Sequence, residues 1–227
     1  MISQHDFGPF TNSDPVWSPD SRGLAFRTFE VGGLRSDIWQ WTLGQPDASA
    51  LRLLADGKDN GIDDWSPDSR FLLIRRDSKL ALRLPLLPDA TPLSVGDSEF
   101  AKDQLQLSPD GARVAYNTVM SGRPEVYVAA FPGFSGRTQI SPAGGVQPLW
   151  RRDGQELFYI AADGTLMSVK GTNAPVTLFK PPSFTFTDST SQYAVSADGQ
   201  RFYVLETVSA PSDTLHVVTQ WNAGLPR

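Results

Sequence analysis

A short turn motif recurs five times along the chain at nearly constant spacing. The copies occupy residues 17–21, 65–69, 107–111, 150–154 and 195–199, and the aspartates at their centres are Asp20, Asp68, Asp110, Asp153 and Asp198. These aspartates are 48, 42, 43 and 45 residues apart (68−20, 110−68, 153−110 and 198−153). A repeat in the forties with four strands per unit is typical of β-propeller blades.

Each copy of the motif predicts a tight hairpin. Serine followed by proline suits a type I turn, because proline presets the backbone angle of the second turn residue. The aspartate side chain can then accept hydrogen bonds from nearby backbone N–H groups. We therefore assign the five motif aspartates a structural role in the turn that joins the first strand of each blade to the second. A metal-binding role for them is the alternative.

A buried strand follows each turn. The fourth to sixth residues after every motif aspartate are apolar or aromatic, at 24–26, 72–74, 114–116, 157–159 and 202–204. Continuous apolar runs of this length are typical of strands buried on both faces, as in blades with a neighbour on each side.

Third and fourth strands complete most units. Partly alternating segments at 37–41, 80–84, 125–128, 165–169 and 215–218 predict third strands. Weaker segments at 51–54, 91–95, 137–140 and 175–179 predict fourth strands, and the fifth unit offers none. The sequence thus predicts an all-β propeller of five visible four-stranded blades in a single domain over residues 1–227. The repeats fall at 12–59, 60–100, 101–145, 146–187 and 188–227.

The ring must close, because an open end exposes apolar blade faces. Residues 5–11 precede the first unit and are predicted as the strand that completes the last blade. Closure with five blades is our expectation. The alternative is that the chain supplies five blades of a six-bladed ring.

Composition excludes several classes of function. The formal net charge is −5 and the pI about 5.0, whereas binding nucleic-acid phosphates needs a basic surface. No run of 18 apolar residues is present, so we expect no membrane insertion by this chain. There is no cysteine, and the two histidines, His5 and His216, have no catalytic partner placed by spacing. We expect no enzymatic activity, cofactor or metal.

One group of polar residues is a candidate binding site. The connections that lead into the first strand of each blade should emerge at one end of the propeller. They are expected to carry Asp14, Asp63, Asp64, Asp103, Gln147 and Gln192. Such an acidic mouth could attract a basic peptide, a cation or a polyol. The alternative is that aspartate and asparagine are simply common in turns.

Two further groups are assigned structural roles. Trp17, Trp65 and Trp150 precede the turn at equivalent positions, which indicates packing between blades rather than ligand stacking. Trp39 and Trp41 share one face of a strand and are assigned to blade packing too, with an interaction patch as the alternative. Arg151 and Arg152 replace the Ser-Pro of the motif and predict a solvated turn.

The repeat resembles the TolB-type, WD-repeat-like propeller motif. Residues 121–128, 131–133, 144–154 and 156–159, with the tail 217–225, also resemble the C-terminal region of certain bacterial serine/threonine kinases. In that family a kinase domain and a membrane segment precede propeller blades that act as a sensor, typically with six motif copies. The resemblance implies a sensor or protein-interaction module outside the cytoplasm, with a protein or small-ligand partner. It leaves a freestanding propeller enzyme or a TolB-like periplasmic adaptor as alternatives.

Overall fold

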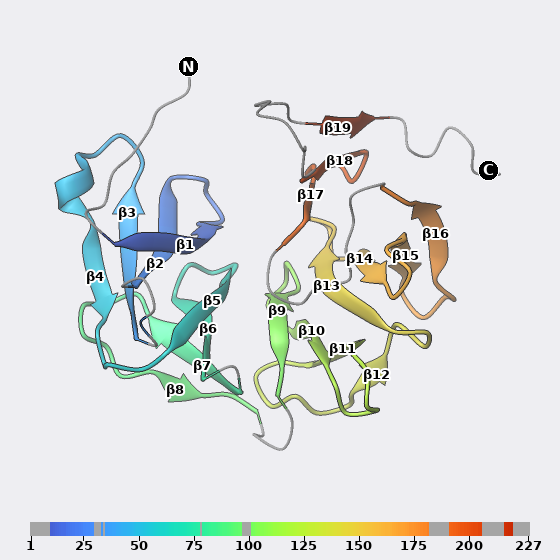
Figure 1. The fold of residues 1–227 in the computed structure, drawn as a ribbon, viewed down its shortest axis with the longest axis horizontal. Helices are drawn as coiled ribbons and strands as arrows, with labels where there is room; N and C mark the ends of the chain where they lie inside the picture. The colour runs from blue at the N-terminus through green and yellow to red at the C-terminus, as the bar shows by residue number, and fades with distance from the viewer. Residues whose placement is uncertain are drawn as a thin grey trace. The chain divides into compact units, whose positions relative to one another are not determined.

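In its described residues the chain forms β-strands joined by turns, with one short 3-10 helix at Asp47–Ser49 (Figure 1). The computed structural model describes residues 10–29, 33, 35–77, 79–96, 101–181, 191–205 and 216–219. The strands of the first two sheets are β1 (Thr11–Trp17), β2 (Gly23–Phe29), β3 (Ser36–Thr42), β4 (Leu51–Leu54), β5 (Asn60–Trp65), β6 (Phe71–Arg76), β7 (Leu80–Pro85) and β8 (Leu93–Ser94). Those that follow are β9 (Asp103–Leu107), β10 (Arg113–Thr118), β11 (Glu125–Ala130), β12 (Thr138–Gln139), β13 (Gly145–Trp150), β14 (Glu156–Ala161), β15 (Leu166–Lys170), β16 (Val176–Phe179), β17 (Tyr193–Val195), β18 (Arg201–Val204) and β19 (His216–Thr219).

These strands form antiparallel sheets in which each strand pairs with its neighbours in sequence. In the described residues there are four sheets of four strands, β1–β4, β5–β8, β9–β12 and β13–β16, and one of three, β17–β19. We call them blades 1 to 5. The all-β propeller class predicted from the repeat is confirmed. The expected closing strand falls largely on residues 5–9, outside the described residues, and Thr11 belongs to β1, where it pairs with Phe29. Ring closure therefore stays a prediction.

The chain divides into two compact units. Unit 1 comprises residues 1–103 with 132–134 and holds blades 1 and 2; unit 2 comprises the rest and holds blades 3 to 5. In unit 1 the second strands contribute Ala25, Leu72 and Ile74 to one apolar core. In unit 2 the corresponding strands contribute Ala115, Leu157, Phe158 and Phe202 to two cores. The buried runs read from the sequence are thus the strands that hold neighbouring blades together.

The five motif copies form the predicted hairpins. In the first, Trp17 pairs with Leu24, Ser21 N–H donates to the Ser18 carbonyl at 2.8 Å, and Arg22 N–H donates to Asp20 Oδ1 at 3.0 Å. The residue after each motif aspartate adopts positive φ: Ser21, Ser69, Gly111, Gly154 and Gly199. A left-handed residue therefore belongs to the turn in every blade.

The fourth copy replaces the serine with Arg151, which is partly exposed, and Arg152, Asp153 and Gln155 around it are exposed, so this turn is solvated as predicted. The Nε and Nη2 of Arg151 donate to the two carboxylate oxygens of Asp153, and its Nη1 donates to Glu156 at 2.8 Å. Arg151 therefore takes the place of the serine hydroxyl as the donor that holds the turn aspartate. Hydrogen bonding by this side chain lowers the pKa of Asp153, as the serine hydroxyl lowers the pKa of Asp20.

The tryptophans follow the packing prediction with one exception. Trp65 and Trp41 are buried, and Trp150 donates from Nε1 to the Gln106 carbonyl of the preceding blade at 3.2 Å. Trp17 is 53% exposed. Trp65, by contrast, covers Gly23 of the preceding blade, because a Cβ built on Gly23 would lie 3.1 Å from its ring.

Candidate functional site: a carboxylate–arginine cluster

The first strands of several blades are interrupted at the same point, and this interruption positions the polar residues singled out from the sequence. The pairing register shifts between Ser13 and Val16 in β1, between Ile62 and Asp64 in β5, and between Val146 and Leu149 in β13. Asp14, Gln104 and Gln147, each three residues before the end of its strand, adopt positive φ. A bulge of this kind re-aims side chains. Asp14, Asp63, Asp64 and Gln147 therefore lie within strands, and not in the connections where the sequence placed them.

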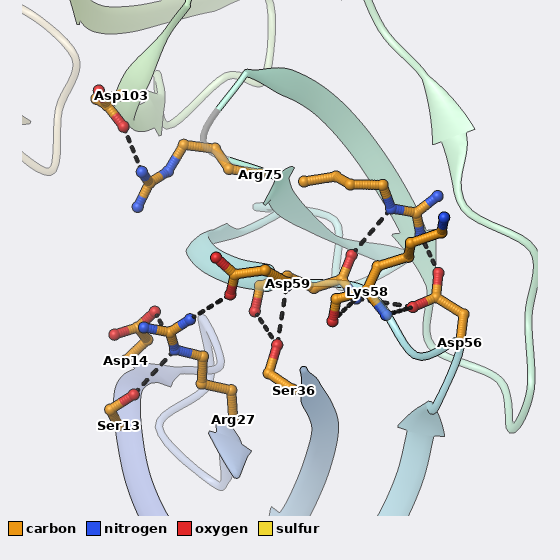
Figure 2. Close-up of polar contacts among 11 residues, drawn as sticks. Ser13, Asp14, Arg27, Ser36, Asp56, Lys58, Asp59, Arg75 and Asp103 are labelled. Atoms are coloured by element: carbon orange, nitrogen blue, oxygen red, sulfur yellow. Dashed lines mark hydrogen bonds and ion pairs between the residues drawn. The ribbon is translucent and has the colours of Figure 1, made fainter. Parts of the chain in front are cut away.

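Two arginines from second strands organise the carboxylates of unit 1 (Figure 2). Arg27 of β2 donates from Nε to Ser13 Oγ at 3.0 Å, and its Nε lies 2.9 Å from Asp14 Oδ2. Its Nη1 donates to Asp59 Oδ1 at 3.1 Å. One guanidinium thus holds a strand residue of blade 1 and the residue that precedes blade 2.

The second arginine joins blade 2 to the first residue of β9. Arg75 of β6 donates from Nε to both carboxylate oxygens of Asp63, at 2.7 and 2.8 Å, and from Nη1 to Asp103. Figure 2 shows the contact with Asp103. Gly61 lies between the two arginine groups, since a Cβ at this position would be 3.4 Å from Arg75 Nη2 and 3.5 Å from Asp14 Oδ2. The two groups form one cluster, which we define as Asp14, Arg27, Asp59, Asp63, Arg75 and Asp103.

Burial divides the cluster into an inner and an outer part. The Asp63 side chain is 3% exposed, whereas those of Asp14, Asp59 and Asp103 are 26%, 41% and 25% exposed. Burial raises the pKa of the Asp63 carboxyl to about 7, against the opposing effect of the Arg75 guanidinium, and the charges of Asp103 and Asp14 add to the rise. Asp63 is therefore the anchor of Arg75, and the three outer carboxylates face solvent.

Asp64 has a local structural role in its own strand. Its Oδ1 accepts a hydrogen bond from the Trp65 backbone N–H at 2.8 Å. This bond supports the bulge of β5.

A second polar group beside the cluster is structural. Asn60 Nδ2 donates to Asp56 Oδ1 at 2.9 Å, and Arg76 donates to both Asn60 Oδ1 and Asp56. Ser36 Oγ accepts from the Asn60 N–H and donates to its carbonyl, each at 2.8 Å, which ties β3 to β5. These bonds fix the segment that carries Asp59.

The two predicted glutamines lie in unit 2 and fasten neighbouring blades. Gln104 Oε1 accepts from the Gln147 N–H, and Gln147 Oε1 accepts from the Gln192 N–H, each at 2.8 Å. Tyr193 Oη also donates to the Gln147 carbonyl at 2.8 Å. Glutamines at one repeat position thus accept a backbone N–H from the same position of the next blade.

The structure brings together Asp14, Asp63 and Asp103 of the predicted residues with Asp59, which the sequence also places in a connection into a first strand, and it adds Arg27 and Arg75. The two arginines could have been found in the sequence, because each stands at the same repeat position, seven residues after its motif aspartate (27−20 and 75−68). Carboxylates outnumber guanidiniums in the cluster, so it can hold a cationic group. Among the described residues no group of three or more histidine, cysteine or acidic side chains is arranged to hold a metal ion. No helix in the described part of the chain is long and apolar enough to cross a membrane.

Comparison with solved structures places the chain among β-propellers. TolB from Acinetobacter baumannii matches with a TM-score of 0.70 at 16% identity, over 88% of this chain and 50% of that one. The putative TolB from Agrobacterium tumefaciens matches with a TM-score of 0.67 at 16% identity, over 94% and 79%. An oligogalacturonate lyase in complex with manganese matches with a TM-score of 0.64 at 10% identity, over 92% and 65%.

The chain spans half the length of the first of these structures. No protein-family model matches the sequence, and no curated protein matches it either. The TolB resemblance read from the repeat is confirmed at the level of the fold, which occurs both in TolB and in a lyase.

Proposed function

We propose that the chain is a non-catalytic protein-binding propeller whose partner places a lysine or arginine side chain on the carboxylate–arginine cluster of unit 1. The observation that carries this proposal is the imbalance of the cluster. Asp14, Asp59 and Asp103 are partly exposed and share two guanidiniums that are also bonded to Asp63 and Ser13. A cation from a partner would complete their pairing, and the negative net charge of the chain would steer such a partner.

The finer form of the proposal concerns the protein to which this module belongs. The resemblance of residues 121–159 to the C-terminal region of serine/threonine kinases supports a role as the sensor or interaction module of a kinase-like protein. This is tested by sequencing the genomic DNA upstream of the Met1 codon. A continuous reading frame that encodes a kinase domain supports the kinase-linked role, and a stop codon with a ribosome-binding site removes it.

Binding is tested by calorimetric titration with a lysine- and arginine-rich peptide and with an acidic peptide of equal length. The basic peptide should bind to the parent chain. Asp14→Asn and Asp103→Asn should each lower its affinity about tenfold, since hydrogen bonds to charged groups contribute roughly 1.5–3 kcal/mol. Asp89→Asn is the matched control, because Asp89 is exposed, has φ near that of Asp14 and lies outside the cluster. Equal affinity of all three variants and the parent chain would rule out this cluster as the binding site.

A further inference from the structure

A pocket lies between blades 3 and 4, wholly within unit 2 and apart from the cluster. Its volume is about 480 Å³, within the range of small-molecule sites. Apolar side chains from both blades form most of its wall, namely Val128, Ile140, Trp150, Leu157 and Val169. Three hydroxyl-bearing residues, Ser135, Thr138 and Thr172, and Arg113 also line it.

The equivalent positions in unit 1 carry larger side chains. Leu72 pairs with Leu84 in blade 2 as Leu157 pairs with Val169 in blade 4. Two residues further on, blade 2 has Leu86, which packs against the unit 1 core, and blade 4 has Gly171. A Cβ built on Gly171 would meet nothing within 4 Å. The pocket therefore lies where blade 4 has Val169 and Gly171 at the positions that Leu84 and Leu86 occupy in blade 2.

Arg113 gives this pocket its charge. Its guanidinium lies over the Trp150 ring, 4.6 Å from the ring centroid, and its Nη2 donates to the Gly154 carbonyl at 3.2 Å. Stacking on an aromatic ring holds the guanidinium plane in place while its edge keeps its donors. Asp110, in the preceding turn, is bonded to Ser108 and to the Ala112 N–H, and these bonds, together with the nearby charge of Arg113, lower its pKa. In contrast to Arg27, Arg75 and Arg151, Arg113 has no carboxylate in ion-pairing contact among the described residues.

From this geometry we infer that the pocket binds a small molecule with an apolar, ring-sized body and a carboxylate. The body would lie against the valine, leucine and isoleucine side chains and the Trp150 edge. The carboxylate would accept hydrogen bonds from the free edge of the Arg113 guanidinium, the kind of donor that matches a carboxylate. This site is separate from the proposed protein-binding cluster, and either can fail without the other.

The test uses the full chain with naphthylacetate as the probe and naphthylacetamide as its neutral counterpart. Affinities come from calorimetry, and the site comes from the NMR shift of the Trp150 indole N–H. The parent chain should bind naphthylacetate saturably, about tenfold more tightly than the amide, since a charged hydrogen bond contributes roughly 1.5–3 kcal/mol. The shift should appear at Trp150 and not at Trp65.

Three variants identify the groups involved. Arg113→Met should lower the affinity for naphthylacetate about tenfold and leave the affinity for naphthylacetamide nearly unchanged. Ala130→Phe places a large side chain in the pocket and should abolish binding of both the acid and the amide. Arg70→Met is the matched control, because that arginine is exposed and lies in unit 1.

Four results would overturn the inference. They are an absence of saturable binding, equal affinity for acid and amide in the parent chain, unchanged binding by Ala130→Phe, or a shift confined to Trp65. The comparison of acid with amide in the parent chain needs no variant, so it decides the question even if Arg113→Met does not fold.

Discussion

At the scale of single residues, the motif aspartate and the left-handed residue after it fix the hairpins. The aspartate accepts backbone N–H bonds in each described turn, for example from Arg22, Arg70 and Gln200. This much was predictable from the sequence, because the chemistry of a Ser-Pro-Asp turn is local. The bond from Arg151 to Glu156 was not predictable, because only the folded hairpin brings these two residues together.

Glycine at the left-handed turn position is expected to stabilise the two blades that have serine there. Ser21 and Ser69 adopt φ of 59° and 57°, where glycine stands in the other three copies. Replacing a non-glycine residue at positive φ with glycine removes a steric cost of roughly 1 kcal/mol, offset in part by the entropy of the unfolded chain. Ser21→Gly and Ser69→Gly should therefore each raise the free energy of unfolding slightly, by up to about 1 kcal/mol, measured in urea.

The matched control is the reverse substitution where space is open. Gly111 has φ of 69° and no atom within 4 Å of a built Cβ. Gly111→Ala should lower the free energy of unfolding by about 1 kcal/mol through backbone strain alone. If both serine variants are less stable than the parent chain, the left-handed strain does not limit these turns.

Asp63 predicts the pH dependence of stability. Its pKa is raised to about 7 from 3.8 by burial, so between these values the folded chain binds more protons than the unfolded chain. The stability from Asp63 is fully present below the unfolded value and is lost as pH rises through about 7. Urea unfolding between about pH 4 and pH 8 should show a decline in the parent chain that is smaller in Asp63→Asn. Parallel curves for the two proteins would contradict the raised pKa.

At the scale of the element, each blade depends on its neighbour through the bulged first strand. The buried runs at 24–26, 72–74, 114–116, 157–159 and 202–204 lie in β2, β6, β10, β14 and β18 as expected. The fourth strands were harder to place, since β8 and β12 contain only two residues each. The bulges could not be predicted, because positive φ at Asp14, Gln104 and Gln147 is imposed by tertiary bonding and not by local propensity.

The glutamine bonds between blades predict a specific loss of stability. In Gln147→Asn the side chain is shorter by one methylene, so the Gln192 N–H should lose its acceptor, while asparagine still tolerates the φ of 56°. A buried donor left without a partner costs about 1–3 kcal/mol. The variant should unfold at lower urea concentration, and the Gln192 amide should exchange faster with deuterium. Unchanged exchange at Gln192 would show that this bond does not hold blade 5.

At the scale of the whole molecule, the repeat predicted the fold and only part of the candidate site. The apolar positions of the repeat locate the core, whereas the position of Arg27 and Arg75 varies, since the other three repeats have Asn117, Ile160 and Leu205 there. Asp14 and Asp103, which the sequence assigns to an acidic mouth, are ion-paired with arginines and only partly exposed. The pocket of unit 2 could not be predicted from the sequence. It depends on Gly171, which stands at the position that Leu86 occupies in blade 2.

The central claim is that each repeat forms one blade built outward from a buried second strand, and hydrogen–deuterium exchange over the whole chain tests it most directly. Amides of β2, β6, β10, β14 and β18 should exchange slowest in their repeats, and those of the fourth strands β4, β8, β12 and β16 should exchange faster. Five maxima of protection, spaced like the motif aspartates, would support the account. Protection that rises and falls without the period of the repeat would contradict it.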